Sequence, residues 1–168
     1  MPLKLESSNL DAYLESSDVI NCKQIEICET AIQLSHAEPT EIAKAKRIYE
    51  FVRDQISHTF DIQGEIVTCT ASEVLQYRQG ICFAKSHLLA AMLRSVGIPT
   101  GLCCQRLVCE QGQGPEFTLH GLNAIYLVRQ CQEITSCFLR RVRSWFDDVI
   151  PGWTEGSMHN IERCHLLI

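Results

Sequence analysis

The sequence predicts a single α+β domain, in which a helical N-terminal half packs on a small antiparallel sheet. The chain has 168 residues, a length that usually forms one domain around one hydrophobic core. Two segments with strong helical patterns, 40–56 and 82–96, come first in the chain. Two strand-like runs, 100–109 and 117–128, follow them, so helices and strands occupy separate parts of the sequence.

The clearest amphipathic helix is predicted to start after Thr40. Thr40 is a suitable N-cap, and Glu41 places a negative charge in the first turn. Apolar residues then recur at steps of three and four, at Ile42, Ala45, Tyr49, Val52 and Ile56. Residues 10–34 have a weaker pattern and are expected to form one or two short helices on the same core.

Two further helices are predicted on either side of Gly80. The first covers residues 72–79, with Ser72 as a possible N-cap and Gly80 closing it. The second covers residues 82–96 and ends before Gly97. Its apolar face is formed by Leu89, Met92, Leu93 and Val96.

The two strand-like runs are separated by a loop that contains Gly112 and Gly114. In the run 117–128, both alternating faces carry large apolar residues, which indicates an interior strand. Residues 128–168 then contain no lysine, both tryptophans and weak periodicity of either kind. This change of composition is the one candidate boundary in the chain.

Charge and apolar patterning count against several classes of protein. The net charge of −5 lacks the basic excess that binding to nucleic acid or to an anionic membrane surface requires. The longest plain apolar run, Leu88 to Leu93, has six residues, whereas a bilayer-spanning helix needs about 20. Residues 1–11 lack the apolar region of a secretory signal, so the cytoplasm is the expected compartment.

The chain has ten cysteines, and their spacing argues against a metal site. The sequence has no Cys-x-x-Cys and no closely spaced pair of histidines, so a structural zinc ion has little support. In a reducing compartment these thiols stay reduced and behave as small apolar groups. Nine of the ten are therefore expected to be buried, and neither a metal nor an organic cofactor is expected.

Cys82 is the exception, because it follows Gly80 closely and opens a predicted helix. Glycine permits a tight turn there, and the N–H groups and dipole of a helix start favour the thiolate form. Cys82 is therefore the candidate nucleophile. The alternative is a buried thiol at a helix start, because reactive cysteines are identified by their environment rather than by position.

A thiol nucleophile needs a base within hydrogen-bonding reach, and three histidines are candidates for that role. His87 points about 140° away from Cys82 on the helix, which favours a packing or surface role. His58 follows the first strong helix, where a capping or solvated histidine is the alternative. His120 lies among apolar residues of the predicted interior strand, so it needs a polar partner there. A core histidine with a satisfied hydrogen bond is the alternative for His120.

A third group would orient the imidazole by accepting its other N–H. Asn123 is three residues from His120, which places it on the opposite face of a strand unless a bulge intervenes. Asp147 and Asp148, beside Trp145, are the other candidates.

Two segments resemble the transglutaminase-like superfamily of papain-type fold. They are 80–99, GICFAKSHLLAAMLRSVGIP, and 119–127, LHGLNAIYL. Residues 48–58 and 68–75 are similar to the region before the nucleophile in bacterial members. The resemblance covers about residues 40–127, and it combines a cysteine at a helix start, an Arg-x-x-Gly-Ile-Pro ending and a later strand that carries histidine.

The resemblance implies a transglutaminase-like core with a Cys-His-Asp triad, in which Cys82 is the nucleophile and His120 the general base. It implies a hydrolase or acyltransferase that acts on peptide or protein amides through a thioester. The family usually has its Asp soon after the histidine strand, and Glu133 is the only acid near that place. Asp147 and Asp148 come 27 and 28 residues after His120, so either the loop is enlarged or the third member is missing.

Two alternatives follow from this departure. Residues 128–168 of the single domain 1–168 are either a divergent tail or a segment read in a shifted frame, which would leave the sheet incomplete. The chain is correspondingly either an active cysteine enzyme, with Asp147 or Asp148 as the acid, or an inactive binding module that keeps the fold. Loss of the orienting acid can lower a triad's rate by about four orders of magnitude.

Overall fold

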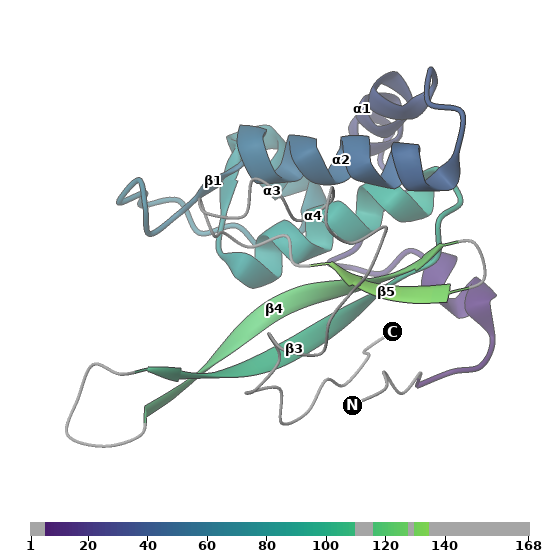
Figure 1. The fold of residues 1–168 in the computed structure, drawn as a ribbon. Helices are drawn as coiled ribbons and strands as arrows, with labels where there is room; N and C mark the ends of the chain where they lie inside the picture. The colour runs from purple at the N-terminus through teal and green to yellow at the C-terminus, as the bar shows by residue number, and fades with distance from the viewer. Residues whose placement is uncertain (1–5, 110–115, 128–129, 135–168) are drawn as a thin grey trace.

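A computed structural model describes residues 6–109, 116–127 and 130–134 (Figure 1). The helices are η1 (Leu10–Leu14), α1 (Ile25–Ser35), α2 (Glu41–Gln55), α3 (Ala71–Tyr77) and α4 (Cys82–Ser95). The strands are β1 (Ser57–His58), β2 (Gln79–Gly80), β3 (Thr100–Cys109), β4 (Glu116–Leu127) and β5 (Gln130–Ile134). Helices α2, α3 and α4 lie on one face of the antiparallel sheet β3-β4-β5, which confirms the predicted α+β class.

The N-terminal helices form as their local sequence predicts. Thr40 caps α2, because its hydroxyl accepts a hydrogen bond from the N–H of Ala43 at 3.1 Å. The inward face of α2 is completely or almost completely buried and consists of Ala45, Ile48, Tyr49 and Val52. Upstream, η1 and α1 are the two short helices expected within residues 10–34.

Helix α3 exists as predicted, but both of its predicted ends were wrong. Thr70, not Ser72, is the N-cap: its hydroxyl accepts the N–H of Glu73, while the Glu73 carboxylate accepts the N–H of Thr70. Arg78 ends the helix in the left-handed conformation with φ 55°, so Gly80 is not the closing residue. Thr70 is the more stable cap, because it makes two reciprocal hydrogen bonds with Glu73, whereas a serine hydroxyl alone would make one.

Helix α4 lies at the centre of the molecule and contacts α1, α2 and α3 as well as the sheet. The predicted helix at 82–96 is confirmed, and Gly97 follows it with φ +81°. Instead of one apolar face, α4 is buried nearly all round, including every residue from 88 to 94. Two charged residues, Lys85 and Arg94, are buried with it.

Strand β4 is the interior strand, as predicted, with β3 and β5 paired antiparallel on its two sides. Its pairing with β3 runs without a bulge from Glu116 opposite Cys109 to Ile125 opposite Thr100. Along β4, Ile125 and Leu127 belong to the main core with α4. Residues Leu122 and Ala124 pack instead with Tyr13 and Cys103, so η1 covers part of the opposite face.

The described cysteines are thiols of different exposure. Cys22 and Cys103 are buried, and Cys28 and Cys104 are partly buried. Cys69 is exposed, so the expectation of burial was wrong there, because it lies in the loop that leads into α3. Within the part of the chain that the structure describes, no helix has the length and apolar character needed to span a membrane.

Candidate active site

The candidate nucleophile, Cys82, is the first residue of α4 and is partly buried. Ile81 precedes it as the N-cap, and no described side chain caps this helix by a hydrogen bond. The first N–H groups of α4 and the positive end of its dipole lie at Cys82. A helix start is a position that can stabilise a thiolate, so Cys82 stays the predicted nucleophile.

The segment before Cys82 is held in place by a small parallel pair of strands. β1 and β2 pair with Ser57 opposite Gln79 and His58 opposite Gly80. A Cβ atom at Gly80 would lie 3.1 Å from the Cβ of Ala84, and Gly80 does not have a positive φ. The expectation that Gly80 serves a tight turn was therefore wrong, since it is lack of space that favours glycine here.

Strand β4 approaches the start of α4 at Gly121. A Cβ atom at Gly121 would lie 3.0 Å from both the Cα and the N atom of Phe83. Cys82 precedes Phe83 and His120 precedes Gly121, so the Cα atoms of Cys82 and His120 are at most about 12 Å apart. The backbone segments that carry Cys82 and His120 therefore lie side by side at this point.

Alternation along β4 separates His120 from Asn123. Gly121 and Asn123 face α4, and the Asn123 Nδ2 donates a hydrogen bond to the carbonyl of Ser86 at 3.0 Å. His120 is partly buried, and by strand alternation it belongs to the other face of β4, away from α4. Because β4 has no bulge here, the prediction that Asn123 does not face His120 is confirmed.

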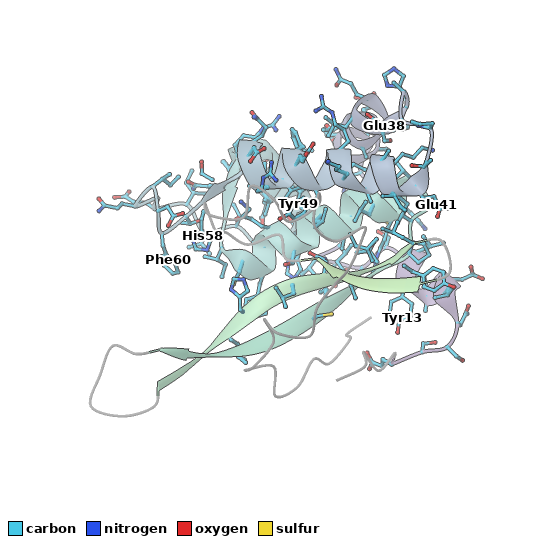
Figure 2. All side chains as sticks on the ribbon, viewed as in Figure 1. Tyr13, Glu38, Glu41, Tyr49, His58 and Phe60 are labelled. Atoms are coloured by element: carbon cyan, nitrogen blue, oxygen red, sulfur yellow. The ribbon has the colours of Figure 1, made fainter. Side chains whose placement is uncertain are left out.

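The two other histidines have identifiable neighbours. The Nδ1 of His87 lies 2.7 Å from the carbonyl oxygen of Cys69, which confirms a packing role away from Cys82. His58 pairs with Gly80 through its backbone and packs its ring against Phe60, with ring centroids 5.6 Å apart (Figure 2). The strand pairing therefore places the backbone of a second histidine, His58, beside the segment that leads into Cys82.

Lys85 is a feature of the site that the sequence analysis missed. Its side chain is 1% exposed, and its Nζ donates a hydrogen bond of 2.5 Å to the carbonyl of Ile56, at the end of α2. Lys85 is three residues after Cys82, so the two side chains start on neighbouring positions of one helix face. A lysine in a helical pattern usually lies on the solvent-exposed face of the helix, and only the packing of α2 on α4 shows that Lys85 is buried.

Arg94, at the far end of α4, has a structural role. Its Nε donates to the carbonyl of Thr100 at 2.9 Å and its Nη1 to that of Glu15 at 2.6 Å, while its buried Nη2 has no hydrogen-bond partner among the described residues. Burial lowers the pKa of Arg94, although opposing charges act against this. The Arg-x-x-Gly-Ile-Pro segment thus fixes the end of α4 to β3 and to the N-terminal segment.

The acid of the expected triad does not lie opposite His120 within the described sheet. Asp147 and Asp148 lie outside the described residues. Glu133 pairs with Ala124 on β4, four residues or about 13 Å along the strand from His120. The described strand residue opposite His120 is Gln105 on β3. No group of three His, Cys, Asp or Glu in the described ranges is arranged to hold a metal ion.

The sequence matches the family model of the transglutaminase-like superfamily over residues 29–145. The chain belongs to this superfamily. The matched range contains Cys82, His120 and Glu133 and ends before Asp147. The resemblance seen in the sequence is thereby confirmed, and the α+β arrangement is the superfamily's papain-like core.

Solved structures show the same fold at low sequence identity. A protein from Cytophaga hutchinsonii, proposed to be a cysteine protease, aligns with a TM-score of 0.61 and 17% identity. A proposed protease from Parabacteroides distasonis aligns with a TM-score of 0.52 and 18% identity. The alignments cover 77% and 76% of this chain, but only 42% and 25% of the two other chains. No curated protein matches the chain significantly.

Proposed function

We propose that this superfamily member is a cysteine-dependent hydrolase or acyltransferase that cleaves peptide or protein amides, with Cys82 as nucleophile and His120 as general base. The contact of Gly121 with the backbone of Phe83 carries the proposal. It places the histidine-bearing strand beside a helix start that favours a thiolate. The proposal includes the cytoplasm as the compartment, where such a thiol stays reduced.

The reaction requires two proton transfers by one imidazole. His120 takes the proton of Cys82, and the sulfur attacks the carbonyl carbon of the substrate amide. The oxyanion that forms accepts hydrogen bonds from first-turn N–H groups of α4, including that of Cys82. The C–N bond then breaks as the imidazolium of His120 protonates the leaving amine. The product is a thioester on Cys82.

The thioester is resolved by a second nucleophile. Water, in hydrolysis, or an amine, in acyl transfer, attacks the carbonyl while His120 accepts its proton. The C–S bond breaks, the proton passes to the sulfur, and Cys82 returns to its initial state. In this proposal Asp147, with Asp148 as the alternative, orients His120.

The second candidate function is an inactive or impaired module that binds peptides with the same fold. The observation that favours it is the strand register, which sets Glu133 opposite Ala124 and Gln105 opposite His120. Without an acid to hold the imidazole, the rate of a triad can fall by about 10⁴-fold while the fold persists. Activation of the Cys82 thiol distinguishes the two functions.

The test is the pH dependence of alkylation at Cys82, followed by peptide mass mapping because nine other cysteines compete. The ordinary pKa of a cysteine thiol is about 8.5. If the protein is an active enzyme, we expect Cys82 to react fastest of the ten cysteines and to keep reacting well below that pH. His120→Ala should abolish this advantage, whereas His58→Ala, the matched control, should leave it. An ordinary pH profile that neither variant changes would contradict the enzyme and favour the binding module. Loss in His58→Ala alone would contradict the assignment of His120.

A further inference from the structure

Exposed aliphatic side chains flank both proposed catalytic residues. Ile81, directly before Cys82, is 37% exposed, and Leu119, directly before His120, is 60% exposed. The segments that carry these two side chains lie next to each other, because Gly121 on β4 approaches Phe83 on α4. The groups that flank a substrate amide at Cys82 would therefore lie close to apolar surface from both segments.

The loop 59–68 adds a larger group of apolar side chains beside the same segment. Among the described residues, nine large apolar side chains are exposed, and four of them are in this loop. They are Phe60 at 76%, Ile62 at 50%, Ile66 at 45% and Val67 at 91%. Together with Ile81 and Leu119, this makes six of the nine exposed apolar side chains, and all six lie in loop 59–68 or directly before Cys82 and His120. Single exposed apolar residues are normal, but a group of them marks an interaction surface.

Hydrogen bonds attach this loop to the residues just before the nucleophile. The N–H of Thr59 donates to the carbonyl of Gly80 at 3.3 Å. The hydroxyl of Thr68 donates to the carbonyl of Gln79 at 3.0 Å, and the Gln79 Nε2 donates to the carbonyl of Ile66 at 3.2 Å. Figure 2 shows Phe60 beside His58, at the end of the molecule where β1 lies. Both ends of the loop are therefore fixed next to the start of α4.

We propose that the substrate is a peptide with a large apolar side chain close to the amide that is cleaved, and that Leu119, Ile81 and loop 59–68 bind this side chain. The inference rests on the proposed function, because Ile81 and Leu119 directly precede the proposed nucleophile and base, and loop 59–68 is hydrogen-bonded to Gln79 and Gly80. Loop 59–68 also carries Asp61 and Glu65, both exposed, which disfavour an acidic substrate.

The experiment compares two peptidyl chloromethyl ketones, acetyl-Leu-Gly and acetyl-Gly-Gly, as labels of Cys82 in the full chain. Iodoacetamide, which has no side chain to bind, reports the activation of the thiol separately. We expect the leucine reagent to react at least about tenfold faster, which is the discrimination that one apolar side chain usually gives.

Variants of the exposed residues locate the preference. Val67→Ser and Leu119→Ser should each reduce the leucine-to-glycine rate ratio several-fold without changing the rate with iodoacetamide. Ile25→Ser and Ile32→Ser are matched controls, because both residues are exposed on α1, at 68% and 55%. All four positions are exposed, so the variants should fold, and their thermal unfolding checks this.

The outcomes separate the two proposals. Equal rates for both ketones, with an activated thiol toward iodoacetamide, would overturn the apolar substrate and leave the enzyme in place. A preference that survives Val67→Ser and Leu119→Ser would assign it to another surface and also overturn the inference. An ordinary thiol toward iodoacetamide would overturn the proposed function and this inference with it. Equal ketone rates together with a lower sedimentation mass in Val67→Ser would assign the surface to a second copy of the chain.

Discussion

Gly121→Ala would place a methyl group in the narrow space between β4 and the start of α4. The new Cβ would lie 3.0 Å from the Cα and N atoms of Phe83 and 2.9 Å from the Cδ1 of its ring. Carbon atoms pack best at about 3.5–4.0 Å, so strand and helix would have to separate by about 0.5–1 Å. The ring of Phe83 can rotate away, but its backbone belongs to α4 and cannot.

We expect two effects of Gly121→Ala. Overpacking of this kind lowers the free energy of unfolding by about 1–3 kcal/mol, and Gly121→Val should lower it further. A displacement of about 1 Å at a catalytic pair can reduce the rate by about 10²-fold. The alkylation advantage of Cys82 below pH 8.5 should therefore fall sharply, although neither Cys82 nor His120 is changed.

Denaturant unfolding measures the first effect, and the pH profile of alkylation measures the second. Ile48→Val is the matched control, because Ile48 is fully buried in α2 and loss of one methyl costs about 0.5–1.5 kcal/mol. This variant should lose stability while Cys82 keeps the wild-type profile. Wild-type stability and wild-type alkylation in Gly121→Ala would show that the contact with Phe83 does not position the site.

Two further predictions concern groups around the site. Lys85→Met removes a buried positive charge one helical turn after Cys82. The pKa of the Cys82 thiol should therefore rise, and alkylation at pH 7 should slow several-fold. An unchanged pH profile would show that the charge does not act on the sulfur. Hydrogen bonds from the backbone N–H groups of Cys69 and Thr70 lower the pKa of Glu73. The stability that this carboxylate contributes is therefore fully present above its unfolded-state pKa of about 4.3, and it is lost as the pH falls through the lower folded-state pKa. Glu73→Gln should therefore be less stable than wild type at pH 7 and lose less stability on acidification, which urea unfolding at a series of pH values would measure; parallel curves would contradict the role of the carboxylate.

The sequence predicted the elements whose signals act over a few residues. The hydroxyl of Thr40 and the apolar residues that follow it specify α2 locally, and the apolar residues on both faces of 117–128 indicated the central position of β4. The rejection of His87 was also correct, because its direction depends only on the pitch of α4. Cys82 at a helix start could be found in the same way.

The ends of α3 show where local signals are ambiguous. Thr70 and Ser72 both have a hydroxyl that can cap a helix, and Ser72 was the predicted cap. The reciprocal hydrogen bonds with Glu73 decide for Thr70. At the other end of α3, Arg78 adopts a positive φ. Glycine adopts this conformation more easily, which is why the sequence predicted Gly80 as the closing residue.

Only the tertiary structure decided which residues meet at the candidate site. The need for glycine at Gly80 and Gly121 comes from atoms of α3, α4 and the 59–68 loop that pack against them, not from their own φ angles. His58 comes beside Gly80 through a parallel pair of only two residues each, too short to leave a periodic signal. The strand register, likewise, sets Glu133 opposite Ala124 rather than His120.

By itself, the sequence determined the order and type of α2, α3, α4, β3 and β4, the superfamily and the candidate nucleophile, because these depend on patterns within one helix or strand. The burial of Lys85 and Arg94 depends instead on carbonyl groups 29 and 79 residues away in the chain. The same holds for the approach of Gly121 on β4 to Phe83 on α4. A contact between distant segments is fixed by how whole helices and strands pack, and no local pattern specifies it.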